Sequence, residues 1–302
     1  MTAIEIENLT KRYGEVVAND SLSFAVEEGE VFGYLGPNGA GKTTTIRTAM
    51  GFQSPTDGTI RVLGHDVRDE RELIEAKRRV GYLPEGPAFD ETLTGTELLD
   101  LHAKVKGGDR RDELLDLFDP PIERKIRGYS SGNVQKLGLV QAFMHDPDLV
   151  ILDEPTSGLD PLMVQRFNEF IRGERRRGKT VFMSSHVLSE VRRVCDRVGI
   201  IRDARLVTTE RVEALLTRSG KFVRLRAREE IPREGLLRDG VHNLAHQITD
   251  DGGVMTEATF TYTGDINPLL DRLAGYDLLD VDLQEAPLEE VFMRFYGGEA
   301  DA

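Results

Sequence analysis

A glycine-rich segment near the start of the chain has the residue types of a phosphate-binding loop. The sequence Gly36-Pro37-Asn38-Gly39-Ala40-Gly41-Lys42-Thr43 matches the spacing G-x-x-x-x-G-K-[ST], and Thr44 follows it. Glycines let backbone N–H groups converge on phosphate oxygens, and the start of a helix adds partial positive charge. The Lys42 ammonium suits the terminal phosphates, and the Thr43 hydroxyl suits Mg²⁺. The segment therefore predicts a nucleotide site.

Two acidic residues follow an apolar segment further along the chain. The run Leu149–Leu152 reads as a buried strand, and Asp153 and Glu154 come directly after it. A carboxylate at the end of such a strand can hold Mg²⁺, which we expect of Asp153. A second carboxylate near the γ-phosphate can polarise an attacking water, which we expect of Glu154. Beside the phosphate loop, this pair predicts nucleotide hydrolysis.

The elements that must position these residues alternate between strands and helices. An apolar strand, Val31–Leu35, precedes the loop, and residues 43–50 can form a helix after it. Helical periodicity dominates residues 69–145, and strands and helices alternate again over residues 149–201. Alternation of this kind predicts an α/β fold with a mostly parallel sheet. Further strands are expected at residues 4–8, 21–26 and 58–63.

The last part of the chain differs in charge and in pattern. Residues 221–302 carry 8 basic and 17 acidic side chains, and a turn signal at residues 217–220 precedes them. Their pattern predicts the order β-α-β-β-α-β, a ferredoxin-like arrangement, with a final helix at residues 287–295. The expected elements are a strand at 222–227, a helix at 233–238, strands at 241–248 and 254–262, a helix at 266–273 and a strand at 278–283. We therefore expect a small α+β domain.

Several short motifs lie in a fixed order around the loop and the acidic pair. Tyr13 precedes the loop, and the segment Tyr129–Lys136 contains Ser130-Ser131-Gly132-Asn133 at the start of a predicted helix. Ser157–Asp160 follows Glu154, and His186 comes later. This ordered set resembles the ATP-binding cassette (ABC) ATPases, with their signature segment, D-loop and switch histidine.

The resemblance implies a fold and a division into domains. Residues 1–217 are expected to form the P-loop NTPase fold of an ABC cassette, with a β-rich core and a helical subdomain at about residues 86–145. Residues 221–302 are expected to form an accessory domain. The segment Pro287–Arg294 is similar to the chain ending of the subgroup that exports drugs, antibiotics and polysaccharides.

The family arrangement also implies roles for single residues. Two cassettes bind head to tail around two ATP molecules, so the chain is expected to pair with itself or with a similar cassette. Tyr13 would stack on adenine, and His186 would contact the γ-phosphate beside the catalytic Glu154. The residues expected across the dimer interface are Ser130, Ser131, Gly132, Asn133 and Asp160.

Three positions depart from the family pattern. Glu85 stands where the family usually has a glutamine that contacts Mg²⁺, and a carboxylate can serve as the same ligand. Ser131 replaces a glycine, and Asn133 replaces a longer glutamine. The expected Mg²⁺ ligands are thus Thr43, Glu85 and Asp153.

Composition and resemblance together imply a membrane partner. The longest stretch without a charged residue, residues 31–41, is too short to span a bilayer. The family then implies a separate transmembrane permease, which docks in a groove near Glu85–Thr94 and holds the chain on the cytoplasmic face of the membrane. The formal net charge of −14 argues against nucleic acid as a partner. A single cysteine, Cys195, excludes an intrachain disulfide.

Two other functions remain open at this point. Soluble ABC ATPases act on DNA or ribosomes, but those relatives usually carry paired cassettes, a long coiled coil or basic inserts. A degenerate cassette could instead bind ATP only as a dimerisation switch. Glu85 and Asn133 favour that reading, whereas Glu154 and His186 oppose it. The sequence predicts an ATP-hydrolysing transporter subunit, most simply an exporter.

Overall fold

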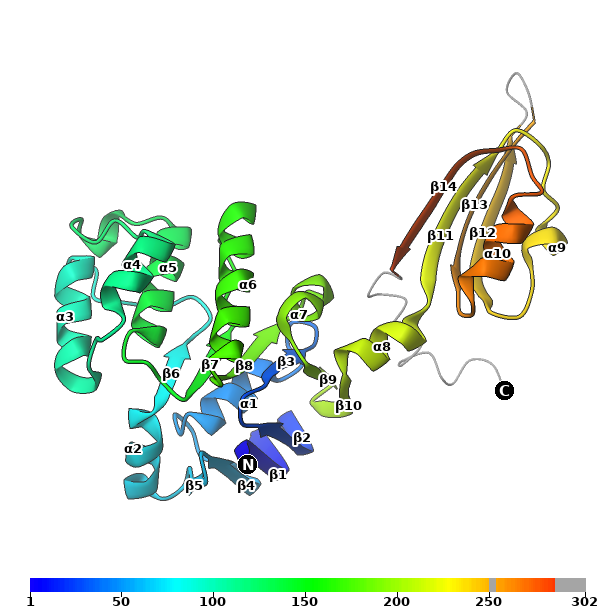
Figure 1. Cartoon of the computed structure of the whole chain (residues 1–302). Coiled ribbons are helices and arrows are strands. Elements are labelled where there is room, and N and C mark those ends of the chain that lie inside the picture. Colours follow the sequence, from blue (N-terminus) through cyan, green and yellow to red (C-terminus); the bar gives the residue numbers. More distant parts are fainter. Residues whose placement is uncertain (250–253, 286–302) are drawn as a thin grey trace. The chain divides into compact units, whose positions relative to one another are not determined.

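The computed structural model describes residues 1–249 and 254–285 of the chain. The chain divides into two compact units, Met1–Val212 and Glu213–Ala302 (Figure 1). The helix expected at residues 287–295 lies outside the described residues. No helix in the described ranges is both long and apolar enough to cross a membrane.

The first unit contains a six-stranded sheet in the order β10-β9-β3-β8-β7-β6. Five of its strands run parallel, and β10 pairs antiparallel with β9 at one edge. Every residue of β3 and β7 is buried, as expected for strands that are covered on both faces. The strands are β3 (Val31–Leu35), β6 (Val80–Leu83), β7 (Leu149–Asp153), β8 (Thr180–Ser185), β9 (Arg197–Arg202) and β10 (Arg205–Arg211). The mostly parallel sheet expected from the sequence is confirmed.

A second sheet in this unit is antiparallel and has the order β2-β1-β4-β5. Its strands are β1 (Thr2–Tyr13), β2 (Val16–Glu27), β4 (Asp57–Val62) and β5 (His65–Asp66). Apolar residues of both sheets share one core, in which Phe24 of β2 stacks on Phe32 and Tyr34 of β3. This aromatic packing fixes β3, and therefore the loop that follows it, against the antiparallel sheet.

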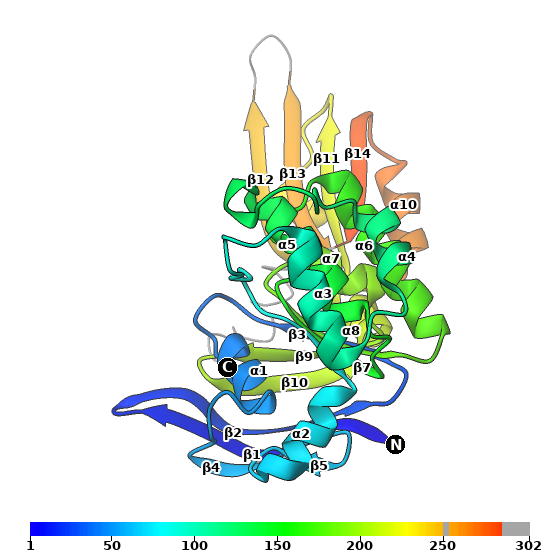
Figure 2. The same cartoon turned by 90° about the vertical axis from the view of Figure 1, so that its left-hand side faces the viewer.

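The helices of the first unit fall into two groups. Figures 1 and 2 place α3, α4 and α5 together, at the end of the unit away from the antiparallel sheet. The group is α3 (Gly95–Lys106), α4 (Arg111–Phe118) and α5 (Ser131–Phe143), with a short 3-10 turn at Ile126–Gly128. The remaining helices are α1 (Lys42–Ala49), α2 (Glu70–Arg78), α6 (Pro161–Arg176), α7 (Leu188–Val194) and α8 (Val212–Ser219).

The second unit has one antiparallel sheet in the order β12-β13-β11-β14, which is visible in Figure 2. Its elements along the chain are β11 (Lys221–Ala227), α9 (Arg233–Leu236), β12 (Val241–Thr249), β13 (Met255–Tyr262), α10 (Ile266–Leu273) and β14 (Leu278–Glu285). Leu236 of α9 and Leu269 of α10 pack with Leu225 and Phe260 of the sheet in one buried cluster. The order of strands and helices expected from the sequence is confirmed.

Some elements differ from expectation. The strands expected at residues 4–8 and 21–26 are parts of the longer β1 and β2. The strands β5 and β10 were not predicted, because charged residues interrupt both segments and apolar residues do not alternate clearly with polar ones there. The turn expected at residues 217–220 is instead the end of α8, and only Gly220 has the positive φ of a turn, at 76°.

Candidate active site

The loop between β3 and α1 places backbone where a phosphate group can approach. Gly41 has φ of 108°, and a Cβ there would lie 2.2 Å from the Ala18 carbonyl oxygen. A Cβ at Gly36 would lie 2.4 Å from the Ile201 carbonyl oxygen. These close approaches require glycine at both positions. Gly39 has φ of 82° and open space where its side chain would stand, so the loop has room for a ligand at its middle.

The first turn of α1 suits an anion. Its N-cap residue is Gly41, which supplies no side-chain acceptor, and the turn contains no acidic residue. The first N–H groups of a helix have no partner within the helix, so those that follow Gly41 remain available. Together with the partial positive charge of the helix start, they favour a phosphate group.

Lys42 lies buried at the centre of the site. Its ammonium donates a hydrogen bond to the Gly36 carbonyl oxygen at 2.7 Å, which folds the side chain back over the loop. The same Nζ is 3.3 Å from Oε1 of Glu154. The loop lysine and the acidic residue directly after β7 therefore lie next to each other, although 112 positions separate them in the sequence.

Ser184, near the end of β8, holds both acidic residues. Its hydroxyl donates to Oδ1 of Asp153 at 2.6 Å and accepts from the Glu154 backbone N–H at 3.0 Å. Because β7 and β8 are parallel neighbours, Ser184 stands directly opposite Asp153 in the sheet. The sheet register thus orients both carboxylates toward the loop that follows β3.

Glu154 has a backbone conformation that is uncommon for its residue type. Its φ is 50°, in the left-handed region, where a residue with a side chain is strained. In this backbone conformation, Oε2 of the Glu154 side chain lies 2.9 Å from Nδ1 of His186. Since a carboxylate can only accept, the Nδ1–H of His186 is the donor. Glu154 thus contacts both Lys42 and His186.

The residues expected to bind Mg²⁺ lie around one point. The Thr43 hydroxyl donates to Oε2 of Glu85 at 3.5 Å. Oδ2 of Asp153 is buried and accepts no hydrogen bond from the described part of the chain. Burial raises the pKa of Asp153, and the neighbouring charges of Glu85 and Glu154 raise it further. A buried carboxylate oxygen without a donor, close to other acidic groups, fits a hard cation with oxygen ligands.

The signature and D-loop residues form two helix starts. Ser130 is the N-cap of α5 and accepts from the Asn133 N–H at 3.3 Å, and Asp160 is the N-cap of α6 and accepts from the Met163 N–H at 2.9 Å. A Cβ on Gly132 would lie 2.6 Å from the Gly158 carbonyl oxygen, so the two segments touch. Ser130 and Ser131 are exposed, and within the described residues no hydrogen bond or ion pair joins them to the phosphate loop.

Tyr13 lies at the exposed end of β1. Half of its surface is accessible, and its hydroxyl donates to Oε1 of Gln53. The ammonium of Lys11 lies 5.0 Å from the centre of its ring. The hydroxyl contact with Gln53 therefore holds one end of the ring, while the exposed half of the residue is accessible to a stacking partner.

Comparison with known proteins identifies the family. A family model described as ABC transporter matches residues 19–157. The chain is 34% identical over 304 residues to the bacitracin transport ATP-binding protein BcrA of Bacillus licheniformis, and the match covers 98% of each chain. It is also 34% identical to the Nod factor export ATP-binding protein I of Burkholderia orbicola, with 98% of this chain and 97% of the relative covered.

The chain belongs to the ABC transporter ATP-binding proteins. It is therefore an ABC transporter ATPase, and the resemblance found in the sequence is confirmed. A solved ATP-binding subunit of an ABC transporter is 32% identical, with a TM-score of 0.64 over 71% of this chain and 92% of the other. A dimeric post-hydrolysis state of the cassette MJ0796 bound to ADP and Pi shares the fold, with a TM-score of 0.64 and 23% identity over 69% and 98% of the two chains.

Three supporting residues of this ABC ATPase did not emerge from the sequence. Ser184 binds both acidic residues, and Gln135 of α5 donates to the backbone carbonyl oxygen of Pro155 at 2.8 Å. Glu190 accepts from Thr156 and Ser185, which ties α7 to the segment after Glu154. The only feature of the nearby sequence that indicates a role for Ser184 is its position two residues before His186.

The cassette also has a groove between its core and its helical group. A cavity of about 400 Å³ lies against β6, the segment after it, α3 and the end of α5. Its lining combines apolar residues with cationic ones and with two histidines: Met50, Phe52, Lys77, Tyr82, Pro84, Pro87, Ala88, Phe89, His102, Lys106, Gln141 and His145. Glu85, an expected Mg²⁺ ligand, is directly next to Pro84, so the groove and the active site share one segment.

Proposed function

We propose that this ATPase drives an exporter whose membrane-spanning part is a separate permease. The relatives named for bacitracin transport and Nod factor export match nearly the full chain, which supports export over import. The observation that carries the hydrolytic role is the contact of Glu154 with both Lys42 and His186. We place the protein at the cytoplasmic face of the membrane, where the permease would hold it.

ATP would bind through the loop and the first turn of α1. The glycines of the loop and the first N–H groups of α1 would surround the phosphates, and Lys42 would contact the terminal ones. Phosphate oxygens would compete with Glu154 for the Lys42 ammonium, which would free the carboxylate for catalysis. Tyr13 would stack on the adenine, because half of its surface is exposed.

The residues around Thr43 would hold Mg²⁺. Thr43, Asp153 and Glu85 supply oxygen ligands, the donor type that this ion prefers. When bound, Mg²⁺ would neutralise charge on the phosphates. The carboxylate of Glu85 would add one negative charge compared with the usual glutamine.

Hydrolysis would use Glu154 as the general base. Its carboxylate would accept a proton from water as the water oxygen attacks the γ-phosphorus and the bond to the ADP oxygen breaks. His186 would hold Glu154 through its Nδ1–H and would itself contact the γ-phosphate. Ser184 would fix the position of Glu154 through the backbone N–H.

The second half of each ATP site would come from another cassette. Ser130 and Ser131 are exposed at the start of α5, and such a helix start suits the γ-phosphate. Ser131, Gly132, Asn133 and Asp160 would line the same interface. The partner cassette would be a second copy of this chain or a similar subunit. The MJ0796 cassette, which shares the fold, also has a dimeric structure, which supports pairing of cassettes.

The permease would dock in the groove beside β6. Phe52 is 57% exposed at its rim, and the ammonium of Lys77 lies 4.9 Å from the centre of that ring. An exposed aromatic residue next to a cation suits an amphipathic helix of a partner. Because the groove continues into the segment that carries Glu85, docking there would connect the permease to the ATP site.

We also propose the division into a cassette at residues 1–217 and an accessory domain at residues 221–302. Within the cassette, residues 86–145 would be the helical subdomain, since α3, α4 and α5 fall inside that range. The accessory domain would be a ferredoxin-like α+β fold. The strand order β12-β13-β11-β14, with α9 and α10 on one face, supports that classification.

Replacing Glu154 by glutamine tests the hydrolytic role. Glu154→Gln keeps a hydrogen-bond acceptor for Lys42 but removes the base, so we expect ATP to bind while turnover falls by about 10²–10⁴-fold. The ATP-bound dimer should accumulate on size exclusion, because it forms but is not released. Glu169→Gln, on the exposed face of α6, is the matched control. Unchanged turnover in Glu154→Gln would refute Glu154 as the base, whereas ATP binding without any turnover in the unaltered chain would favour a cassette that acts only as a switch.

A charge placed in the groove tests the docking proposal. Phe52→Glu should abolish co-purification with the proposed permease while leaving ATP binding intact, because a carboxylate there is not compatible with an apolar contact. Val207→Glu on β10 makes the same change at an exposed site of the other sheet edge and should have no effect. Undiminished co-purification of Phe52→Glu would remove the groove as the docking site.

A further inference from the structure

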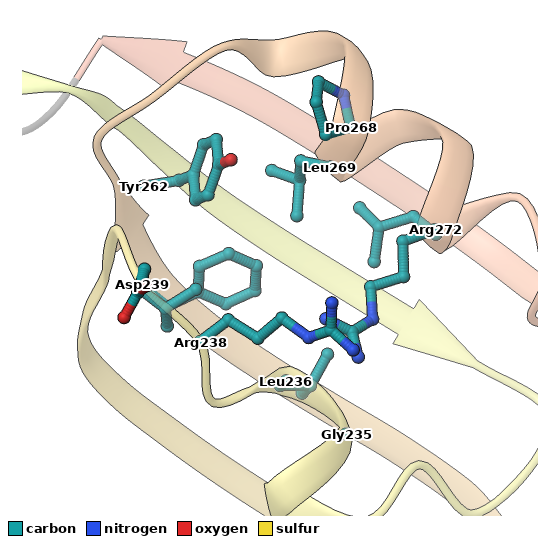
Figure 3. A pocket seen from close by; sticks show the side chains of 11 residues that line it. Gly235, Leu236, Arg238, Asp239, Tyr262, Pro268, Leu269 and Arg272 are labelled. Atoms are coloured by element: carbon teal, nitrogen blue, oxygen red, sulfur yellow. The ribbon is translucent and has the colours of Figure 1, made fainter.

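The C-terminal unit contains a cavity that the ATPase cycle does not use. It has a volume of about 600 Å³ and lies between α9, α10 and the sheet (Figure 3). Pockets of this size hold small molecules in many proteins. Its lining comes from α9 and the turn after it, from β12 and β13, and from α10.

Two arginines reach into this cavity from different elements. Arg238 follows α9 and Arg272 belongs to α10, and Figure 3 shows their side chains pointing toward each other across the pocket. Within the described part of the chain, neither guanidinium makes an ion pair or a side-chain hydrogen bond. Two like charges that converge without a counter-ion repel each other, so an anion between them would be stabilised.

The one carboxylate in the described lining does not neutralise them. Asp239 stands next to Arg238 in the sequence, but in Figure 3 its carboxylate points away from both guanidinium groups, and no ion pair joins it to either arginine. The pocket is therefore locally cationic, although residues 221–302 have a net charge of −9. The acidic surroundings would repel an anion at long range, so binding must depend on contacts inside the pocket.

The rest of the lining is apolar and aromatic. Phe260 and Leu273 are buried at its base, and Leu269 of α10 is nearly as buried. Tyr262 of β13 adds an aromatic ring whose hydroxyl, in Figure 3, faces the cavity. A ligand that fits must therefore bury a hydrophobic body as well as a charged group.

We propose that this cavity binds a small amphipathic anion, with a carboxylate or phosphate head between Arg238 and Arg272. The planar guanidinium groups can each form two parallel hydrogen bonds to such a head. An aromatic or short aliphatic body would lie over Phe260 and Leu269. This site is distinct from the ATP site, because every lining residue belongs to the C-terminal unit.

Binding of simple probes to the full-length protein tests the proposal. The protein is saturated with ADP so that the phosphate loop is filled, and isothermal titration is run with phenyl phosphate and with phenylacetate. Inorganic phosphate and benzyl alcohol are the comparison probes, since each has only one half of the required chemistry. At least one aromatic anion should bind about tenfold more tightly than both comparison probes.

Substitution of the two arginines identifies the site. Arg238→Gln combined with Arg272→Gln should weaken binding of the aromatic anion by about tenfold or more. Arg224→Gln changes an exposed arginine on the opposite face of β11 and should leave the affinity within about twofold of the starting value. If the double variant does not fold, Asp239→Asn provides the readout. Removing that carboxylate should tighten binding about two- to threefold.

Three results would overturn the proposal. The first is that neither aromatic anion binds, or that neither binds more tightly than inorganic phosphate and benzyl alcohol. The second is an affinity unchanged by the double arginine substitution. The third is weaker binding in Asp239→Asn. None of these results would bear on ATP hydrolysis, which is measured separately through Glu154→Gln.

Discussion

At the scale of single residues, the active site depends on contacts between groups that are distant in the sequence. Glu154 contacts Lys42 at 3.3 Å and His186 at 2.9 Å, and Ser184 holds its backbone. The strained φ of Glu154 is retained because these partners fix the residue from three sides. A change at any one of them should alter the position of the base as well as its charge.

The first prediction for a single residue concerns Lys42. Lys42→Ala removes the cation expected at the terminal phosphates, and we expect ATP affinity to fall by about 100-fold or more, since charge-assisted contacts are lost. Titration with a fluorescent ATP analogue measures it. Lys104→Ala, an exposed lysine on α3, is the control and should bind normally. Tight ATP binding by Lys42→Ala would show that the loop is not the phosphate site.

At the scale of elements, the groove contains two enclosed histidines. His102 of α3 and His145, just after α5, lie with ring centres 5.5 Å apart. Burial, together with the nearby ammonium of Lys106, lowers the pKa of each to about 4. In the described structure Nε2 of His102 and Nδ1 of His145 have no hydrogen-bond partner. Both rings are therefore neutral at pH 7 and sit in a pocket that disfavours a proton.

This enclosure predicts an acid-sensitive helical group. Histidines in the unfolded chain take up protons below a pH of about 6.5, whereas in the folded protein His145 and His102 do so only near pH 4. Stability should therefore fall as the pH drops from 6.5 to 4. The neighbouring Asp146 opposes the shift of His145 but does not cancel it. His145→Gln should lose less stability over that range.

Thermal unfolding between pH 4 and 7.5 measures this effect. The wild-type curve also contains the titration of carboxylates, so the informative quantity is the difference between wild type and His145→Gln. His65→Gln, on β5 of the antiparallel sheet, removes one histidine elsewhere and is the control. An equal loss of stability in wild type and His145→Gln would contradict the prediction.

At the scale of the whole molecule, the chain divides into two units with separate cores. The residues of the ATP site all fall within Met1–Val212, and the buried cluster around Leu225 and Phe260 belongs to the second unit alone. The second unit has none of the ATP-site motifs, so we expect it to contribute to dimer stability.

Removal of the second unit tests that contribution. A chain that ends at Gly220 keeps α8 and the complete ATP site, so we expect ATP to bind with unchanged affinity. Dimerisation should weaken when it is measured by analytical ultracentrifugation in the Glu154→Gln background with ATP. Circular dichroism verifies folding of the shortened chain. A dimer affinity equal to that of the full chain would rule out the stabilising role.

Much of the fold could be predicted because its signals are local. The apolar runs of β3 and β7 identify buried strands, and the order of elements in the second unit follows from alternation and turn residues. The edge strand β10 and the short β5 could not be predicted, because their own residues show little hydrophobic pattern. Backbone pairing with β9 and β4 stabilises them instead.

The sequence by itself determined the family, the phosphate loop and the acidic pair, because each of these is a contiguous motif whose residue types its chemistry requires. The family resemblance placed Lys42, Glu154 and His186 near the terminal phosphates. Only the tertiary structure decided their direct contacts, because parallel strands bring their carboxyl ends to one edge of the sheet. It also revealed Ser184 and the cavity between Arg238 and Arg272. Those residues have no fixed spacing in the chain, and their proximity is set by packing of whole elements.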